Sequence, residues 1–108
     1  MKMFFLNTGL ECPEQYDIYD EQKVHRGYVR LRWGRLTVKY PDACGKVLLD
    51  TDAFDGYGSF NNPAERKAYF KDIADLVFDE AQRNGDLQYY EKGIEVVVVP
   101  FGVPFKHQ

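Results

Sequence analysis

The sequence has few of the residues that enzymes use as nucleophiles, bases and metal ligands. It holds one serine, two histidines and two cysteines: Ser59, His25, His107, Cys12 and Cys44. A nucleophile needs a base within hydrogen-bond reach and a third group that orients the base. Because the supply of such groups is small, hydrolytic chemistry is disfavoured, and a non-catalytic protein is favoured over an enzyme.

Long apolar runs and a cysteine framework are also missing. Two cysteines in 108 residues are expected to be free thiols, and a zinc site would need both cysteines and both histidines without any ligand spacing. No apolar run approaches the roughly 20 residues that span a bilayer, and the apolar start at residues 1–6 is too short for a signal-peptide core. We expect a soluble, cytoplasmic protein with no membrane contact, no metal and no cofactor.

The residues that are present indicate one folded domain over residues 1–108. Hydrophobic residues make up 44% of the chain and aromatic residues 16%, far from the composition of disordered proteins. A chain of this length can bury most of the surface that its unfolded form exposes.

The clearest pattern is an alternation of apolar and polar residues over 27–40, interrupted at Trp33-Gly34. Alternation is typical of a half-buried strand, and a glycine between two such runs predicts a hairpin. One face is expected to be apolar and to need a cover: Val29, Leu31, Trp33, Leu36, Val38 and Tyr40. The other face is basic: Tyr28, Arg30, Arg32, Arg35, Thr37 and Lys39.

Further strands are expected at residues 2–6, 16–20 and 46–50, which together with the hairpin make an antiparallel meander. A short strand is also expected at 87–91. Residues 94–99 are β-branched and nearly continuous. A strand that is apolar on both faces is usually interior to a sheet, or it lies against a partner.

One long helix is expected after Asn62, which is a favourable N-cap. Pro63 suits the first helical position, Glu65 lies three residues after the cap, and Asn84-Gly85 supplies the stop. Apolar residues recur at helical spacing in between. The sequence therefore predicts an α+β fold: a mainly antiparallel meander sheet of five or six strands, covered by one amphipathic helix.

The basic face is the first candidate site, although the chain is acidic overall with an isoelectric point of about 5.3. Its candidate partner-binding residues are Tyr28, Arg30, Arg32, Arg35 and Lys39. Tyrosine and arginine are enriched at binding hot spots, which favours a protein partner. The same side chains can meet phosphates and stack on bases, which keeps nucleic acid as an alternative. Cross-strand pairing with Asp17, Asp50 or Asp52 is the purely structural explanation.

A second candidate is the anion or cofactor loop Gly56, Tyr57, Gly58 and Ser59, which leads to the helix N-terminus. The order of meander, glycine-bearing loop, helix and strand over residues 16–99 resembles the middle of an acyl-CoA-dependent N-acetyltransferase. The sequence departs from that family because no arginine or glutamine precedes Gly56, and because Pro63 removes one backbone donor.

A further resemblance rests on residues 27–36 and on Asp55-Gly56-Tyr57-Gly58-Ser59-Phe60 before the capped helix. These stretches are similar to small proteins of phages and mobile elements of Gram-positive bacteria. The resemblance implies a small protein that binds and blocks a host protein, for example one of a defence system. It carries no function onto named residues.

The tail leaves two alternatives open, because Phe101 and Phe105 lie either in the core or in an interface. The function expected from these features is a non-catalytic protein-binding module that acts as an inhibitor. A nucleic-acid-binding protein and a small acyl-CoA-dependent transferase are the alternatives.

Overall fold

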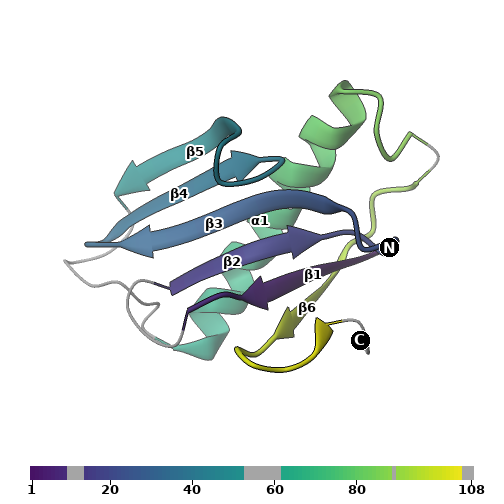
Figure 1. Ribbon diagram of the computed structural model, residues 1–108. Helices are drawn as coiled ribbons and strands as arrows, with labels where there is room; N and C mark the ends of the chain where they lie inside the picture. Colours follow the sequence, from purple (N-terminus) through teal and green to yellow (C-terminus); the bar gives the residue numbers. More distant parts are fainter. Residues whose placement is uncertain (10–13, 53–61, 89, 106–108) are drawn as a thin grey trace.

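The computed structural model describes residues 1–9, 14–52, 62–88 and 90–105. Within them, one helix packs on one face of a six-stranded sheet (Figure 1). The elements are β1 (Lys2–Asn7), β2 (Glu14–Tyr19), β3 (His25–Arg32), β4 (Arg35–Tyr40), β5 (Lys46–Asp52), α1 (Pro63–Arg83) and β6 (Glu95–Val99). The α+β class, with a single helix on a sheet, is confirmed.

The first five strands form the expected antiparallel meander, and the sheet order is β5-β4-β3-β2-β1-β6. The last strand returns to the first, where β6 pairs in parallel with β1 and Glu95 lies opposite Lys2. Of the two alternatives for residues 94–99, the interior strand is therefore wrong, because β6 is at the edge of the described sheet, whereas contact with a partner stays a prediction. The β-branched run encodes a strand, but it does not encode how many neighbours that strand has.

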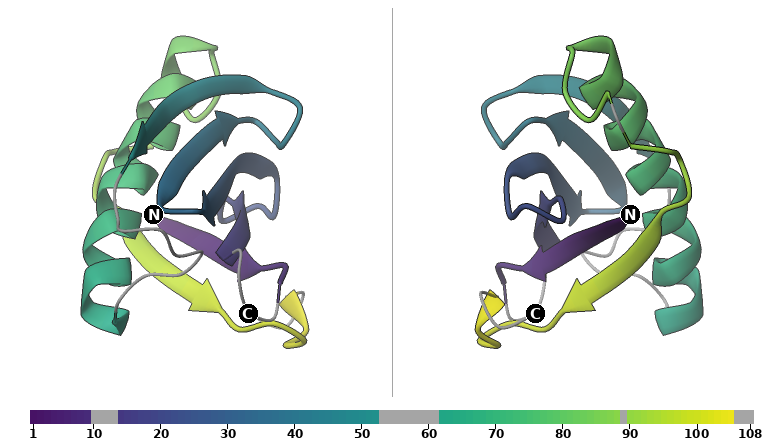
Figure 2. Two further views of the ribbon diagram at one scale, coloured as in Figure 1. Left: turned by 90° about the vertical axis from the view of Figure 1, so that its left-hand side faces the viewer. Right: turned by 90° about the vertical axis from the view of Figure 1, so that its right-hand side faces the viewer.

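The core lies between α1 and the face of the sheet that α1 covers (Figure 2). Alternate strand residues point into it, including Val29 and Leu31 of β3 and Leu36 and Val38 of β4, all fully buried. The helix contributes Phe70, Ile73, Ala74, Val77, Phe78 and Ala81. Full burial of one such large side chain stabilises the fold by about 1.5–3 kcal/mol.

The helix begins and ends where its sequence signals predict. The Asn62 side chain accepts a hydrogen bond from the Glu65 N–H at 2.8 Å, and Pro63 is the first helical residue. After Arg83, Gly85 has a φ of +84°, which glycine adopts without strain. The helix is thus fixed at both ends by local interactions.

Two local predictions were wrong. Trp33 does not join the buried face, because Trp33 and Gly34 form the two-residue turn itself, with φ angles of +53° and +74°, and Trp33 is 74% exposed. Among the described residues of the expected strand at 87–91, none is in a strand. Leu87 lies in a turn with a φ of +54°, and its side chain closes the core at the C-terminal end of α1.

Glu80 links α1 to β5, and its carboxylate is expected to make the stability of the fold depend on pH. Its buried carboxylate contacts Lys46 at 3.0 Å and Arg83 at 2.6 Å, and these two cations lower its pKa to about 2. Because the folded-state pKa is depressed from 4.5, the stabilisation is complete above about pH 4.5 and is lost as the pH falls toward 2.

We therefore expect Glu80→Gln to lower stability at pH 7, and the difference from the parent chain to shrink between pH 4.5 and 2. Urea unfolding of the parent and of Glu80→Gln at several pH values between 2 and 7 measures this difference in stability. A difference that stays constant with pH would contradict the assignment.

Candidate functional site

The face of the sheet opposite α1, here called the open face, brings the candidate basic residues together. Alternation places them on neighbouring strands, with Tyr28 opposite Lys39, Arg30 opposite Thr37, and Arg32 opposite Arg35. All five predicted partner-binding residues, Tyr28, Arg30, Arg32, Arg35 and Lys39, thus lie on one surface. The residues between them on β3 and β4 point to the core, so the open face and the core are separate sets of side chains.

Arg35 is paired with the acidic edge of the sheet. Its guanidinium donates to Asp50 at 2.6 and 3.0 Å and lies 3.5 Å from Asp52. The Arg35 guanidinium holds the pKa of the Asp50 carboxyl below its usual range. This part of the cross-strand pairing prediction is confirmed, and Arg35 is largely neutralised.

Other polar groups on this face have different partners from those expected. Asp17 lies 3.2 Å from His25, and no ion pair joins it to a described arginine. The Tyr28 hydroxyl donates to Gln15 Oε1 at 2.8 Å, and Lys39 donates to the carbonyl of Ala43 at 3.3 Å.

Arg30 and Arg32 differ from Arg35, because neither side chain has a hydrogen bond or an ion pair with any described residue. The Nε atom of Arg30 is buried and has no acceptor. Arg32 is exposed and lies opposite another arginine, an arrangement of like charges that destabilises a strand pair. The guanidinium groups of Arg30 and Arg32 can therefore donate hydrogen bonds to a carboxylate or phosphate of a partner.

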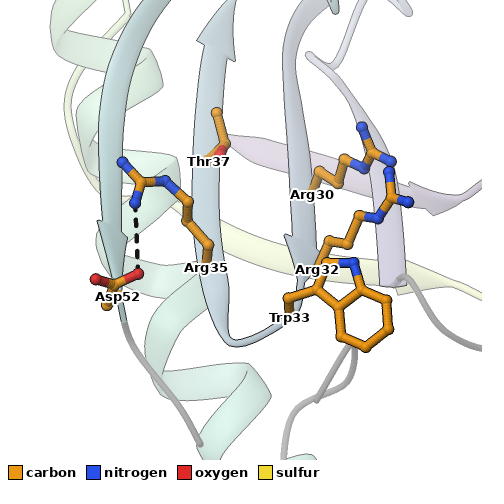
Figure 3. Close-up of a pocket in the computed structure, with 6 residues that line it drawn as sticks. All are labelled: Arg30, Arg32, Trp33, Arg35, Thr37 and Asp52. Carbon is orange, nitrogen blue, oxygen red and sulfur yellow. Dashed lines mark hydrogen bonds and ion pairs between the residues drawn. The ribbon is translucent and has the colours of Figure 1, made fainter. Parts of the chain in front are cut away.

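These two arginines border an open hollow of about 380 Å³ at the hairpin end of the sheet. It is lined by Arg30, Arg32, Trp33, Arg35, Thr37 and Asp52. Figure 3 shows the Arg30 and Arg32 side chains extending in the same direction, with the indole of Trp33 beside Arg32 and with Arg35 turned toward Asp52. We call Arg30, Arg32 and Trp33 the Arg/Trp patch.

Trp33 is a surface residue that the alternation along the strands did not predict. The available signal was the pair Trp33-Gly34 between two arginines, which fits a two-residue hairpin turn with both central residues at positive φ. An exposed indole at the tip of a rigid hairpin offers a large apolar area whose position is fixed by the backbone.

Replacing Trp33 with asparagine is expected to preserve the hairpin and to raise stability by up to about 1 kcal/mol, because asparagine tolerates positive φ better than tryptophan does. Thermal unfolding measures the change. Trp33→Val, which is β-branched and disfavoured at positive φ, should lower the Tm. A Tm for Trp33→Asn several degrees below the parent value would show that the indole supports the fold.

The β1 end of the open face is closed by the tail. The Phe105 ring packs 5.4 Å from Phe4 and 4.7 Å from Tyr19 between ring centroids, and Lys23 Nζ lies 4.4 Å from the Phe105 ring. Phe101 is 48% exposed instead. The accessible part of the open face therefore lies over β3, β4 and β5.

The remaining candidates lie in part outside the described residues. Gly56, Tyr57, Gly58 and Ser59 lie outside the described residues, as do Cys12 and His107. Cys44 is an exposed free thiol. Within the described ranges, no three histidine, cysteine or acidic side chains are grouped as metal ligands would be, and no helix is long and apolar enough to cross a membrane.

Comparisons of the chain with protein-family models, with curated proteins and with solved structures found no match.

Proposed function

We propose that the protein is a non-catalytic protein-binding module and that the Arg/Trp patch contacts an acidic surface of its partner. The observation that carries the proposal is that two guanidinium groups, which no described carboxylate neutralises, line the same hollow as Trp33, a residue that is 74% exposed. Tryptophan and arginine are the residues most enriched at binding hot spots.

The geometry gives each group a distinct role. Burying the Trp33 ring against a partner would remove a large apolar area from water at little entropic cost, because the turn already holds the backbone. The Arg30 and Arg32 guanidinium groups would bind carboxylates, and an acceptor that reaches Arg30 Nε would satisfy a buried donor.

A protein partner is favoured over nucleic acid by the carboxylates on the same face. Asp17 lies beside His25, and Asp50 and Asp52 pair with Arg35, so the described cations without a carboxylate form a small patch and not a continuous basic strip along which a phosphate backbone could run. Nucleic acid remains the second candidate because an exposed indole beside two arginines can stack on a base and bind a phosphate. No contact of the described residues supports the acyl-CoA alternative.

Inhibition of a host protein is the mode of action that fits this surface and the resemblance to phage and mobile-element proteins. A rigid hairpin tip with one large ring and two cations can occupy a partner's acidic cleft without any chemistry of its own.

The test compares capture of proteins from a Gram-positive bacterial lysate by the parent chain and by Arg32→Glu/Trp33→Asn. We expect a specific protein to be captured by the parent and lost by the variant, because the variant reverses one charge and removes the ring. Lys92→Glu, which makes the same charge change on an exposed side chain between α1 and β6, is the matched control and should retain the partner.

Nuclease treatment separates the two candidates. A partner that survives nuclease and depends on Arg32 and Trp33 supports the protein-binding proposal. Capture that disappears with nuclease and weakens steeply with salt would overturn it in favour of nucleic acid. Equal capture by parent and variant would exclude the Arg/Trp patch as the contact surface.

A further inference from the structure

The covered side of the sheet has a second accessible surface, at the edge formed by β6. Two hollows of about 570 and 290 Å³ lie between β6 and the N-terminal half of α1 and share Lys67 and Val96 in their linings. The other residues that line the two hollows are Pro63, Ala64, Arg66, Ala68, Lys71, Ile94, Glu95 and Val98. We call this surface the β6 groove. Figure 2 shows how β6 runs past α1 on this side of the sheet.

The backbone of β6 leaves alternate hydrogen-bonding groups free at this edge. Glu95 N donates to the Met1 carbonyl at 2.9 Å, so the polar backbone groups of Glu95 point to β1. Because these groups alternate along a strand, those of Val96 and Val98 point away from β1, where the described sheet has no further strand.

The side chains of the same two residues face the groove. Val96 lies opposite Met3 and Val98 opposite Phe5, which are both core residues on the helix side of the sheet. Val98 is nevertheless 42% exposed. An edge strand of consecutive valines without an interrupting charge invites the pairing of another strand.

We propose that the β6 edge binds an extended acidic segment of a partner protein, which adds as a seventh strand. Free backbone groups at Val96 and Val98 supply the main-chain hydrogen bonds, and the groove accepts alternate side chains of the segment. The proposal is separate from the Arg/Trp patch and does not depend on it.

The acidic character of the segment follows from the charges along the groove. Neither Lys67 nor Lys71 has an ion pair with a described residue, whereas Glu95 is paired with Lys2 at 3.9 Å and Arg66 with Glu14 at 2.8 Å. One helical turn separates Lys67 from Lys71, about 6 Å. Alternate residues of a strand are spaced by roughly 6.6–6.8 Å, so two acidic side chains two residues apart would match the two lysines.

The same charges argue against a second copy of this chain as the occupant. Antiparallel pairing of two β6 strands about a twofold axis would bring two α1 helices side by side on one face of the joined sheet. Lys67 and Lys71 of one copy would then approach the same lysines of the other copy, with no described acidic residue of the groove free to separate them.

The probe is a synthetic peptide of seven residues with valine at both ends, glutamate at the third and fifth positions and threonine elsewhere. A matched control peptide carries lysine in place of glutamate. In fluorescence polarisation with the full chain, we expect binding of the glutamate peptide and at least tenfold weaker binding of the lysine peptide.

Backbone pairing is tested with two N-methylated forms of the glutamate peptide, one methylated at odd and one at even positions. Only one set of N–H groups faces β6, so one form should lose binding and the other should keep it. If both N-methylated forms still bound, strand addition would be overturned.

The protein variant is Lys67→Glu/Lys71→Glu, whose exposed substitutions are expected to leave the fold unchanged by circular dichroism. It should reverse the preference of the chain from the glutamate to the lysine peptide. Arg32→Glu, on the open face, should bind the glutamate peptide like the parent, so the result is independent of the Arg/Trp patch.

Absence of peptide binding, or binding without charge preference, would overturn the proposal. So would a dimer in sedimentation that Val98→Lys dissociates, because β6 would then be covered by a second copy.

Discussion

Phe70→Ala is expected to lower the free energy of unfolding by about 3–5 kcal/mol. The ring is fully buried, stacks on Phe5 at a centroid distance of 4.4 Å and meets Tyr16 edge-on at 4.7 Å. It therefore holds α1 against both β1 and β2, and its loss leaves a cavity between helix and sheet. Because small domains have a total stability of about 5–15 kcal/mol, this one ring supplies a large share of it.

Urea unfolding of the purified chain measures the effect. Leu76→Ala is the matched control, since Leu76 lies on the same helix but is 36% exposed, and its truncation should cost no more than about 1 kcal/mol. Similar losses for the two variants would contradict the assignment of Phe70 to the centre of the core.

Asp20→Ala is expected to destabilise the protein by about 3–5 kcal/mol, although it removes a polar side chain. Asp20 is fully buried after β2. Its carboxylate accepts from the backbone N–H groups of Gln22 and Val24 at 2.9 and 3.0 Å and from Arg26 Nε at 2.9 Å. Truncation would leave two turn amides and a guanidinium that is only 15% exposed without this acceptor.

The matched control is Asp86→Ala. Asp86 contacts the same arginine at 3.2 Å and accepts from the Tyr40 hydroxyl at 3.0 Å, but its side chain is 42% exposed. Water can replace those contacts, so we expect a loss of about 1 kcal/mol or less by thermal or urea unfolding. If Asp20→Ala were as mild as Asp86→Ala, the turn between β2 and β3 would not depend on the buried carboxylate.

The parts of the fold that depend on neighbouring residues could be predicted from the sequence. Asn62 and Pro63 begin α1 because a side-chain acceptor and a fixed φ act within one turn of the chain. The alternation over β3 and β4 likewise separates Val29 from Arg30, since the pleat sends successive side chains to opposite faces.

The candidate surface was predicted in part. The sequence placed Arg30, Arg32 and Arg35 together, but it did not show that Asp50 neutralises Arg35 while Arg30 and Arg32 keep no described partner. Trp33 was assigned to the wrong surface because the alternation was continued through the turn, where the backbone leaves the strand and the period of two ends.

The position of β6 was not predictable from local pattern. Its neighbour is β1, near the other end of the chain, and pairing between such distant segments depends on how the whole sheet closes. Valine-rich composition is shared by central and edge strands, so it could not distinguish them.

That pairing of β1 with β6 also sets an order of folding. The meander strands pair with their neighbours along the chain, whereas Met1 meets Gly93, a separation of 92 residues. Closing so long a loop has a high entropic cost until the other contacts exist, so β6 is expected to dock last. During synthesis, β1 would therefore pair with β2 alone, and the backbone groups on its other edge would stay unpaired until β6 has left the ribosome.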